Sequence, residues 1–273
     1  MKKEAQIAIV VLIGFLSLLW LEKPFREFLS IELFEERMAK QISSITVRTF
    51  LIAIALMLIN KFRLLTFTGL NAWKKVRNLQ AVLIAFAIVV LGIVSSWSIY
   101  VNAEIGLLTL FALSTLAVGI VEEFVFRGTI FPLMIKSFKE TNRPLLIAAV
   151  LSSLMFGLVH FINIFSQPEN IVGITSQVFF ATSIGVFFCG VMVRTENILI
   201  PIILHALVNF GFSAGELEVS IGEAATTAET DSSGINWNSI IPTTIFFSFI
   251  LMGGIYMISK TDKAPILSKL EDD

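Results

Sequence analysis

Charged residues are scarce in this chain of 273 residues, because Asp, Glu, Lys and Arg together make up only 15% of it. Soluble domains carry about 25% charged residues on average. Hydrophobic residues reach 56%, and the mean hydropathy is +0.85. The composition therefore excludes an ordinary soluble domain. The net charge of −1 and the lack of a basic stripe also give no indication of a nucleic-acid partner.

Nucleophiles and established hydrolase motifs are missing as well. The single cysteine, Cys189, cannot form an internal disulfide and lies in an apolar stretch without a polar neighbour that would activate it. The chain contains neither the G-x-S-x-G elbow of serine hydrolases nor the H-E-x-x-H motif of zinc proteases. If this protein is a hydrolase, the sequence favours activated water as the nucleophile.

Long apolar runs are what the chain has in abundance. A run of about 17–25 apolar residues can cross a bilayer as a helix. The runs predict an all-α, polytopic membrane helix bundle with about eight transmembrane helices and a polar site inside the membrane. The eight predicted spans are Ala5–Leu21, Ile42–Ile59, Leu79–Ile99, Ile105–Phe131, Leu145–Phe165, Val178–Val193, Leu199–Ser213 and Ile240–Ile258.

These spans divide the chain into four expected regions. Residues 1–78 hold two N-terminal spans with interfacial segments, 79–213 a catalytic core, 214–239 an acidic external loop, and 240–273 the last span and a tail. Lys and Arg gather in alternate connections and in the tail, which predicts that both termini lie in the cytoplasm. Arg48, near the start of the second span, is expected to extend toward the membrane interface.

Three ionisable residues close the fourth apolar run. Glu122, Glu123 and Arg127 lie within six positions, and each such group near the bilayer centre costs roughly 2.5–3.5 kcal/mol. Residues four apart share a helix face, so Glu123 and Arg127 should form an ion pair, while Glu122 points elsewhere and needs another partner. A structural clamp between helices is the alternative interpretation of the Glu123–Arg127 pair.

The only two histidines also lie inside apolar runs. His160 follows Phe156 by four residues, and His205 precedes Asn209 by four. Taken alone, each could be a packing residue, and an intramembrane asparagine commonly links helices. Lipid does not accept these groups on three separate spans, so we expect them to converge with Glu122 and Glu123 in one site. Counting residues from the span ends places this site in the cytoplasmic half of the membrane.

This set of groups suits hydrolysis. A carboxylate with an imidazole can take a proton from water, and an imidazole with an amide can donate to the oxyanion that forms. Two histidines and two carboxylates could instead hold zinc, although asparagine is a poor zinc ligand. We expect a mechanism without a cofactor, with zinc as the alternative. A proton-coupled transporter is disfavoured because the chain shows no internal repeat.

The motifs VEEFVFRG, FGLVH and HALVN, in this order on separate spans, resemble the CPBP family, which includes type II CAAX prenyl endopeptidases and bacteriocin-processing or immunity proteins. The resemblance covers roughly Leu79–Phe212. It implies that Glu122 and His160 activate water, that His205 and Asn209 are oxyanion donors, and that Glu123 and Arg127 position the first carboxylate.

The resemblance also implies a function and a setting. We expect an intramembrane endopeptidase in the plasma membrane of a prokaryote, with CAAX-type C-terminal processing as one option. The expected partners are the lipid bilayer and a membrane-associated protein or peptide substrate, which a prenylated protein would satisfy. A non-catalytic scaffold or a bacteriocin-immunity protein is the alternative.

Overall fold

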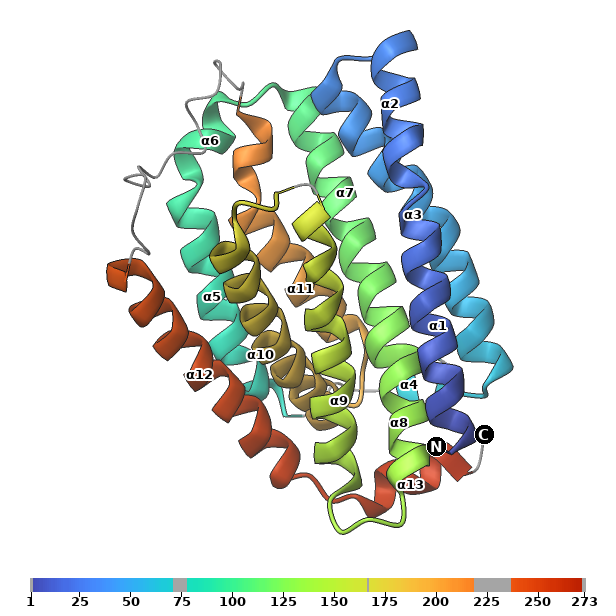
Figure 1. Cartoon of the computed structure of the whole chain (residues 1–273). Coiled ribbons are helices and arrows are strands. Elements are labelled where there is room, and N and C mark those ends of the chain that lie inside the picture. Colours follow the sequence, from blue (N-terminus) through green and yellow to red (C-terminus); the bar gives the residue numbers. More distant parts are fainter. Residues whose placement is uncertain (1, 71–77, 166, 219–236, 272–273) are drawn as a thin grey trace.

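The computed structural model describes residues 2–70, 78–165, 167–218 and 237–271, and within these residues it contains helices and no strands (Figure 1). The predicted all-α bundle is confirmed. Most of the region predicted as an acidic external loop lies outside the described residues. The first elements are α1 (Lys3–Leu19), α2 (Glu22–Glu32), α3 (Glu36–Lys61), α4 (Leu65–Thr68), η1 (Leu79–Val82), α5 (Leu83–Ser95), α6 (Trp97–Asn102) and α7 (Ile105–Val125).

The second half of the chain continues the same pattern. It consists of η2 (Phe126–Ile130), α8 (Phe131–Phe138), α9 (Pro144–Val159), η3 (His160–Phe165), α10 (Ile171–Thr195), α11 (Leu199–Phe212), η4 (Ala214–Leu217), α12 (Trp237–Ser259) and α13 (Ala264–Glu271). In the described part of the chain, six helical segments are long and apolar enough to cross a membrane. Two shorter apolar helices, Gln80–Ser95 and Leu199–Phe212, complete the eight.

One predicted span is broken. The run Leu79–Ile99 was expected to be a single helix, but α5 ends at Ser95 and α6 begins at Trp97. The hydroxyl of Ser96 donates to the carbonyl of Gly211 on α11 at 2.8 Å. A serine at this point therefore anchors the chain to a neighbouring helix at the place where its direction changes.

The fourth span is longer than predicted and contains a π-helical turn. The segment Ile105–Phe138 runs through α7, η2 and α8 as one helical rod of 34 residues. Within η2, the N–H of Phe131 donates to the carbonyl of Phe126, five residues earlier. Such π-bulges occur frequently at functional sites. The bulge follows Glu122 and Glu123 directly and carries Arg127.

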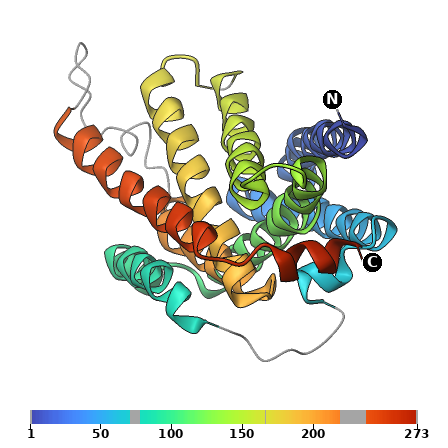
Figure 2. The ribbon, with the colours of Figure 1, turned by 90° about the horizontal axis from the view of Figure 1, so that it is seen from below.

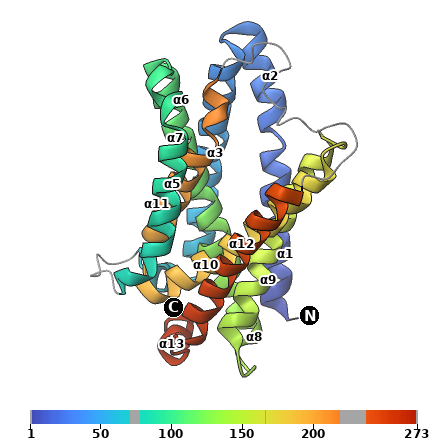
Figure 3. The same ribbon diagram turned by 90° about the vertical axis from the view of Figure 1, so that its left-hand side faces the viewer.

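The helices pack around α7 and α10. α7 lies against α3 and α11, while α10 lies against α9 and α12. Figure 3 shows α12 running obliquely beside α10, and Figure 2 shows α13 crossing the lower end of the bundle. Many large apolar side chains remain exposed on the outside, Ile13, Phe50, Leu91 and Phe249 among them. An apolar exterior on long apolar helices is the surface of an integral membrane protein.

The bundle has two distinct ends. Both chain termini and α13 lie at the lower end in Figure 1, whereas α2 and α6 lie at the upper end. Lys269 of α13 pairs with Glu196 at 2.7 Å, and Ile266 and Leu270 are buried. These contacts fix the C-terminal helix to the end where α10 finishes.

Close packing of α9 on α10 depends on Gly157, three residues before His160. A Cβ at this position would lie 2.7 Å from the carbonyl oxygen of Val178 and would collide with the hydroxyl of Thr182. Gly157→Ala should therefore lower the free energy of unfolding by about 1–3 kcal/mol. Thermal unfolding in detergent would measure this loss.

Gly14 on α1 provides the matched control, because no atom lies within 4 Å of a Cβ placed there. Gly14→Ala should leave stability unchanged or raise it by up to ~1 kcal/mol through helix propensity. Equal stability of the two variants would show that the α9–α10 approach does not need glycine.

Candidate functional site

The predicted polar residues form a chain of charged contacts in the middle of the bundle. Arg127 Nη1 donates to Glu123 Oε1 at 2.9 Å, and His205 Nδ1 lies 2.7 Å from the same oxygen. His205 Nε2 lies 3.4 Å from Glu122 Oε2. The structure thus forms the expected Glu123–Arg127 pair, and it places His205 between the two glutamates.

Burial divides this chain of charged contacts into an inner and an outer part. The side chains of Glu123 and Arg127 are 0% and 1% exposed, whereas that of Glu122 is 19% exposed. Glu123 Oε2 and Arg127 Nη2 are buried without a hydrogen bond to any described residue. A substrate therefore cannot reach Glu123 and Arg127. Glu122 is the carboxylate of this group that a substrate can contact.

Aromatic rings enclose the inner pair. The guanidinium carbon of Arg127 lies 4.8 Å from the ring centre of Phe156 and 5.7 Å from that of Phe188. The His205 ring lies 5.9 Å from Phe156 and 5.6 Å from Phe188. A desolvated cation over an aromatic face gains about 2 kcal/mol or more. The rings thus offset part of the cost of burying Arg127.

Each ring nitrogen of His205 faces a carboxylate. Nδ1 lies 2.7 Å from Glu123 Oε1, and Nε2 lies 3.4 Å from Glu122 Oε2. These two contacts hold the imidazole ring between the buried carboxylate and the one that reaches the cavity.

His160 approaches from the opposite side. It caps α9 at the point where the helix gives way to η3, and its Nδ1 lies 3.2 Å from the carbonyl oxygen of Phe156. Donation from Nδ1–H to this carbonyl leaves Nε2 as an acceptor. No direct contact between Glu122 and His160 is present among the described residues. The two side chains line the same cavity instead.

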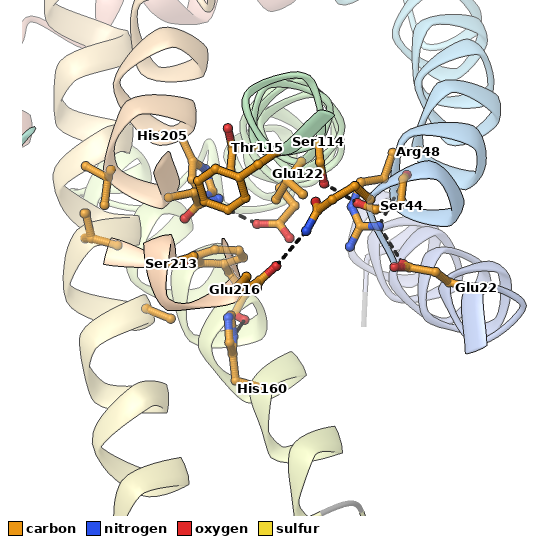
Figure 4. Close-up of a pocket in the computed structure, with 18 of the residues that line it drawn as sticks. Glu22, Ser44, Arg48, Ser114, Thr115, Glu122, His160, His205, Ser213 and Glu216 are labelled. Atoms are coloured by element: carbon orange, nitrogen blue, oxygen red, sulfur yellow. Dashed lines mark hydrogen bonds and ion pairs between the residues drawn. The ribbon is translucent and has the colours of Figure 1, made fainter. Parts of the chain in front are cut away.

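A cavity of about 250 Å³ joins these groups (Figure 4). Several helices line it, among them α3 through Gln41, Ser44 and Arg48, α7 through Ser114, Val118 and Glu122, and α11 through His205, Val208 and Asn209. On α3 and α7 these residues repeat at three- or four-residue intervals, which is the period of one helix face, and on α11 Val208 and Asn209 lie three and four residues after His205. α10 contributes apolar side chains, Phe188 among them. Asn209 lies one turn beyond His205 on α11 and makes no side-chain hydrogen bond to a described residue.

The elements that line the cavity show where it lies along the bundle. Glu122 lies midway along the rod Ile105–Phe138, and the cavity extends to Glu22, Lys40 and Glu216. Glu22 begins α2, Lys40 lies near the start of α3, and Glu216 lies in η4. α2 lies at the end of the bundle opposite the termini (Figure 1). The rod is longer than the predicted span Ile105–Phe131 and extends past it through α8.

Arg48 has a role in the site that the sequence analysis did not predict. It lines the cavity and donates through Nη1 to Glu22 of α2. Sequence reasoning missed it together with Gln41 and Ser44, although the spacing 41, 44, 48 marks a polar stripe on an apolar helix. Phe188 was missed as well, because one phenylalanine among 25 carries no signal.

The residues do not gather as a metal site. In the described part of the chain, no group of three or more His, Cys, Asp or Glu side chains is placed to hold a metal ion. Both ring nitrogens of His205 face carboxylates, and His160 stands apart from them. The zinc alternative therefore does not fit this arrangement.

Part of the chain matches a known protein family. Residues 104–211 match the family model described as type II CAAX prenyl endopeptidase Rce1-like. The matched segment contains all six predicted site residues: Glu122, Glu123, Arg127, His160, His205 and Asn209. No curated protein and no solved structure matches the chain.

Proposed function

We propose that this protein is an intramembrane endopeptidase that uses Glu122 to activate water, because residues 104–211 match the family model of Rce1-like type II CAAX prenyl endopeptidases. The observation that carries the proposal is the cavity shared by Glu122, His160 and Asn209, with Glu122 held by a buried chain of charges behind it.

The reaction follows from the position of each group. Water bound between Glu122 and His160 gives one proton to Glu122 and attacks the peptide carbonyl carbon, while His160 Nε2 accepts the second O–H as a hydrogen bond. The amide of Asn209 donates to the oxyanion. Glu122 then returns the proton to the leaving nitrogen as the C–N bond breaks. The products are a carboxylic acid and an amine.

This proposal gives His205 a role different from the one that the family resemblance implied. Both of its nitrogens face carboxylates, so we assign it to orienting Glu122 rather than to binding the oxyanion. Glu123 and Arg127 hold the imidazole in turn. A metal-free mechanism agrees with this set of contacts, and the metal content of active, detergent-purified protein would test it. Stoichiometric zinc that disappears together with activity would contradict it.

The function itself is testable in cells. Membrane and secreted proteomes should be compared between strains that express the wild type and Glu122→Gln. We expect C-terminal fragments that the wild type removes to persist in the variant strain. Identical proteomes together with an unchanged phenotype would favour the non-catalytic scaffold instead.

Orientation decides from which side a substrate enters. The basic residues at the lower end favour cytoplasmic termini, and the cavity would then open toward the external side. A reporter fused after Asp273 should read as cytoplasmic, and one inserted at residues 219–236 as external. The opposite result would place the cavity mouth in the cytoplasm, where a protein prenylated in that compartment could reach it.

A further inference from the structure

The last turn of α11 carries Asn209, and two side chains from the break between α5 and α6 bind it. The hydroxyl of Tyr100 donates to the carbonyl of Phe210 at 2.6 Å, and the hydroxyl of Ser96 donates to the carbonyl of Gly211 at 2.8 Å. Tyr100 and Ser96 are both buried. The two carbonyls that they bind directly follow Asn209 in the chain.

The end of α11 needs such partners. The last four carbonyls of an α-helix have no partner within the helix. With 14 residues, α11 is about 21 Å long, which is shorter than the hydrocarbon core of a bilayer (~30 Å). Its final carbonyls need donors from the protein, because lipid supplies none. The N–H of Ser213 donates to the carbonyl of Asn209 at 2.9 Å, and the two hydroxyls serve the next two carbonyls.

The side chain next to Asn209 is fixed as well. The ring of Phe210 stacks on that of Tyr100, with centres 4.8 Å apart and planes 14° apart, and it lies 5.4 Å from the ring of Phe111 on α7. The amide of Asn209, by contrast, makes no side-chain hydrogen bond to a described residue. The direction of this amide therefore depends on how firmly the backbone of its helical turn is held.

Close approach of α5 to α11 brings the two hydroxyls into reach. A Cβ on Gly211 would lie 3.0 Å from the Cα of Gly92, so the two backbones nearly touch there. Ser96 and Tyr100 follow Gly92 at intervals of four residues. The glycine contact and the two hydroxyls thus form one continuous junction along the end of α11.

We propose that Tyr100 and Ser96 are positioning residues that hold the last turn of α11 and, through it, the amide of Asn209. This inference rests on the proposed endopeptidase function, in which Asn209 donates to the oxyanion. Asn209 lines the cavity, whereas Tyr100 and Ser96 do not, so both act through the helix and not on the substrate. A donor that is fixed before the reaction requires no reorganisation when the oxyanion forms.

Tyr100→Phe tests this role, because it keeps the ring that stacks on Phe210 and removes only the hydroxyl. We expect kcat to fall about 3- to 10-fold, as for the loss of one hydrogen bond, with KM nearly unchanged. Ser96→Ala should change kcat in the same direction. The measurement is turnover per folded molecule on a peptide that the wild type cuts.

A double-mutant cycle shows whether Tyr100 acts through Asn209. In the Asn209→Ala background, Tyr100→Phe should lower kcat by less than about twofold, because the group that it positions is already gone. An equal loss of kcat in both backgrounds would overturn the proposal. Tyr256→Phe is the matched control, since Tyr256 is the other tyrosine of the chain and is 64% exposed on α12. It should leave kcat unchanged.

Hydrogen exchange separates this inference from the proposed function. The amide of Ser213 reports on the last turn of α11, because it donates to the carbonyl of Asn209. In Tyr100→Phe it should exchange at least about fivefold faster, since the Phe210 carbonyl is left unpaired, and in Tyr256→Phe it should not change. Unchanged exchange in Tyr100→Phe would refute the inference even in an active protease. Faster exchange in a protein that cleaves no membrane protein would support the contact of Tyr100 with α11 and refute the endopeptidase function.

Discussion

Replacing Glu122 by glutamine should lower the turnover number by about 10²–10⁴-fold, the usual contribution of a general base. Glutamine keeps the shape of the side chain and can still hydrogen-bond to His205, so the variant should fold like the wild type. The measurement is kcat on a peptide that the wild type demonstrably cuts, together with the folded yield in size-exclusion chromatography.

Glu140→Gln is the matched control for this experiment. Glu140 is exposed near the end of α8 and lies outside the cavity, so the same chemical change should leave kcat unaffected. Turnover of Glu122→Gln within about tenfold of the wild type would refute the assigned role. The catalytic carboxylate would then have to be sought elsewhere.

Replacing Arg127 by alanine should be the most destabilising change in the site. It would leave the fully buried Glu123 without its cation, and removing one partner of a buried ion pair costs about 3–5 kcal/mol. It would also remove the cation that lies between Phe156 and Phe188. Unfolding in detergent should show this loss of stability. Activity should also fall, because Arg127 fixes Glu123, Glu123 holds His205, and His205 orients Glu122.

Two further variants make this result interpretable. Arg143→Ala, an exposed arginine at the start of α9, should change stability by less than about 0.5 kcal/mol. The double variant Glu123→Gln/Arg127→Met should recover part of the stability lost in Arg127→Ala, because no uncompensated charge remains. It should not recover activity. Normal stability of Arg127→Ala would show that the pair is not a structural clamp.

The sequence by itself determined that the protein is a membrane helix bundle and which polar residues make up the site. Apolar runs of sufficient length can bury their backbone polar groups only as helices in lipid, which decides the fold class. Glu123 and Arg127 are four residues apart, so the period of a single helix already brings their side chains together, whatever the tertiary structure. Buried polar groups on separate spans must find one another, so the grouping of Glu122, His160 and His205 in one cavity was predictable as well.

Only the tertiary structure decided which groups meet within that cavity. Contact between residues on different helices depends on how the helices cross. The sequence did not predict that His205 lies between Glu122 and Glu123, because α11 and α7 are far apart along the chain. The contact of Arg48 with Glu22 was not predicted for the same reason, because Glu22 comes from another helix. Pairing between helices is a property of packing, which no single helix encodes.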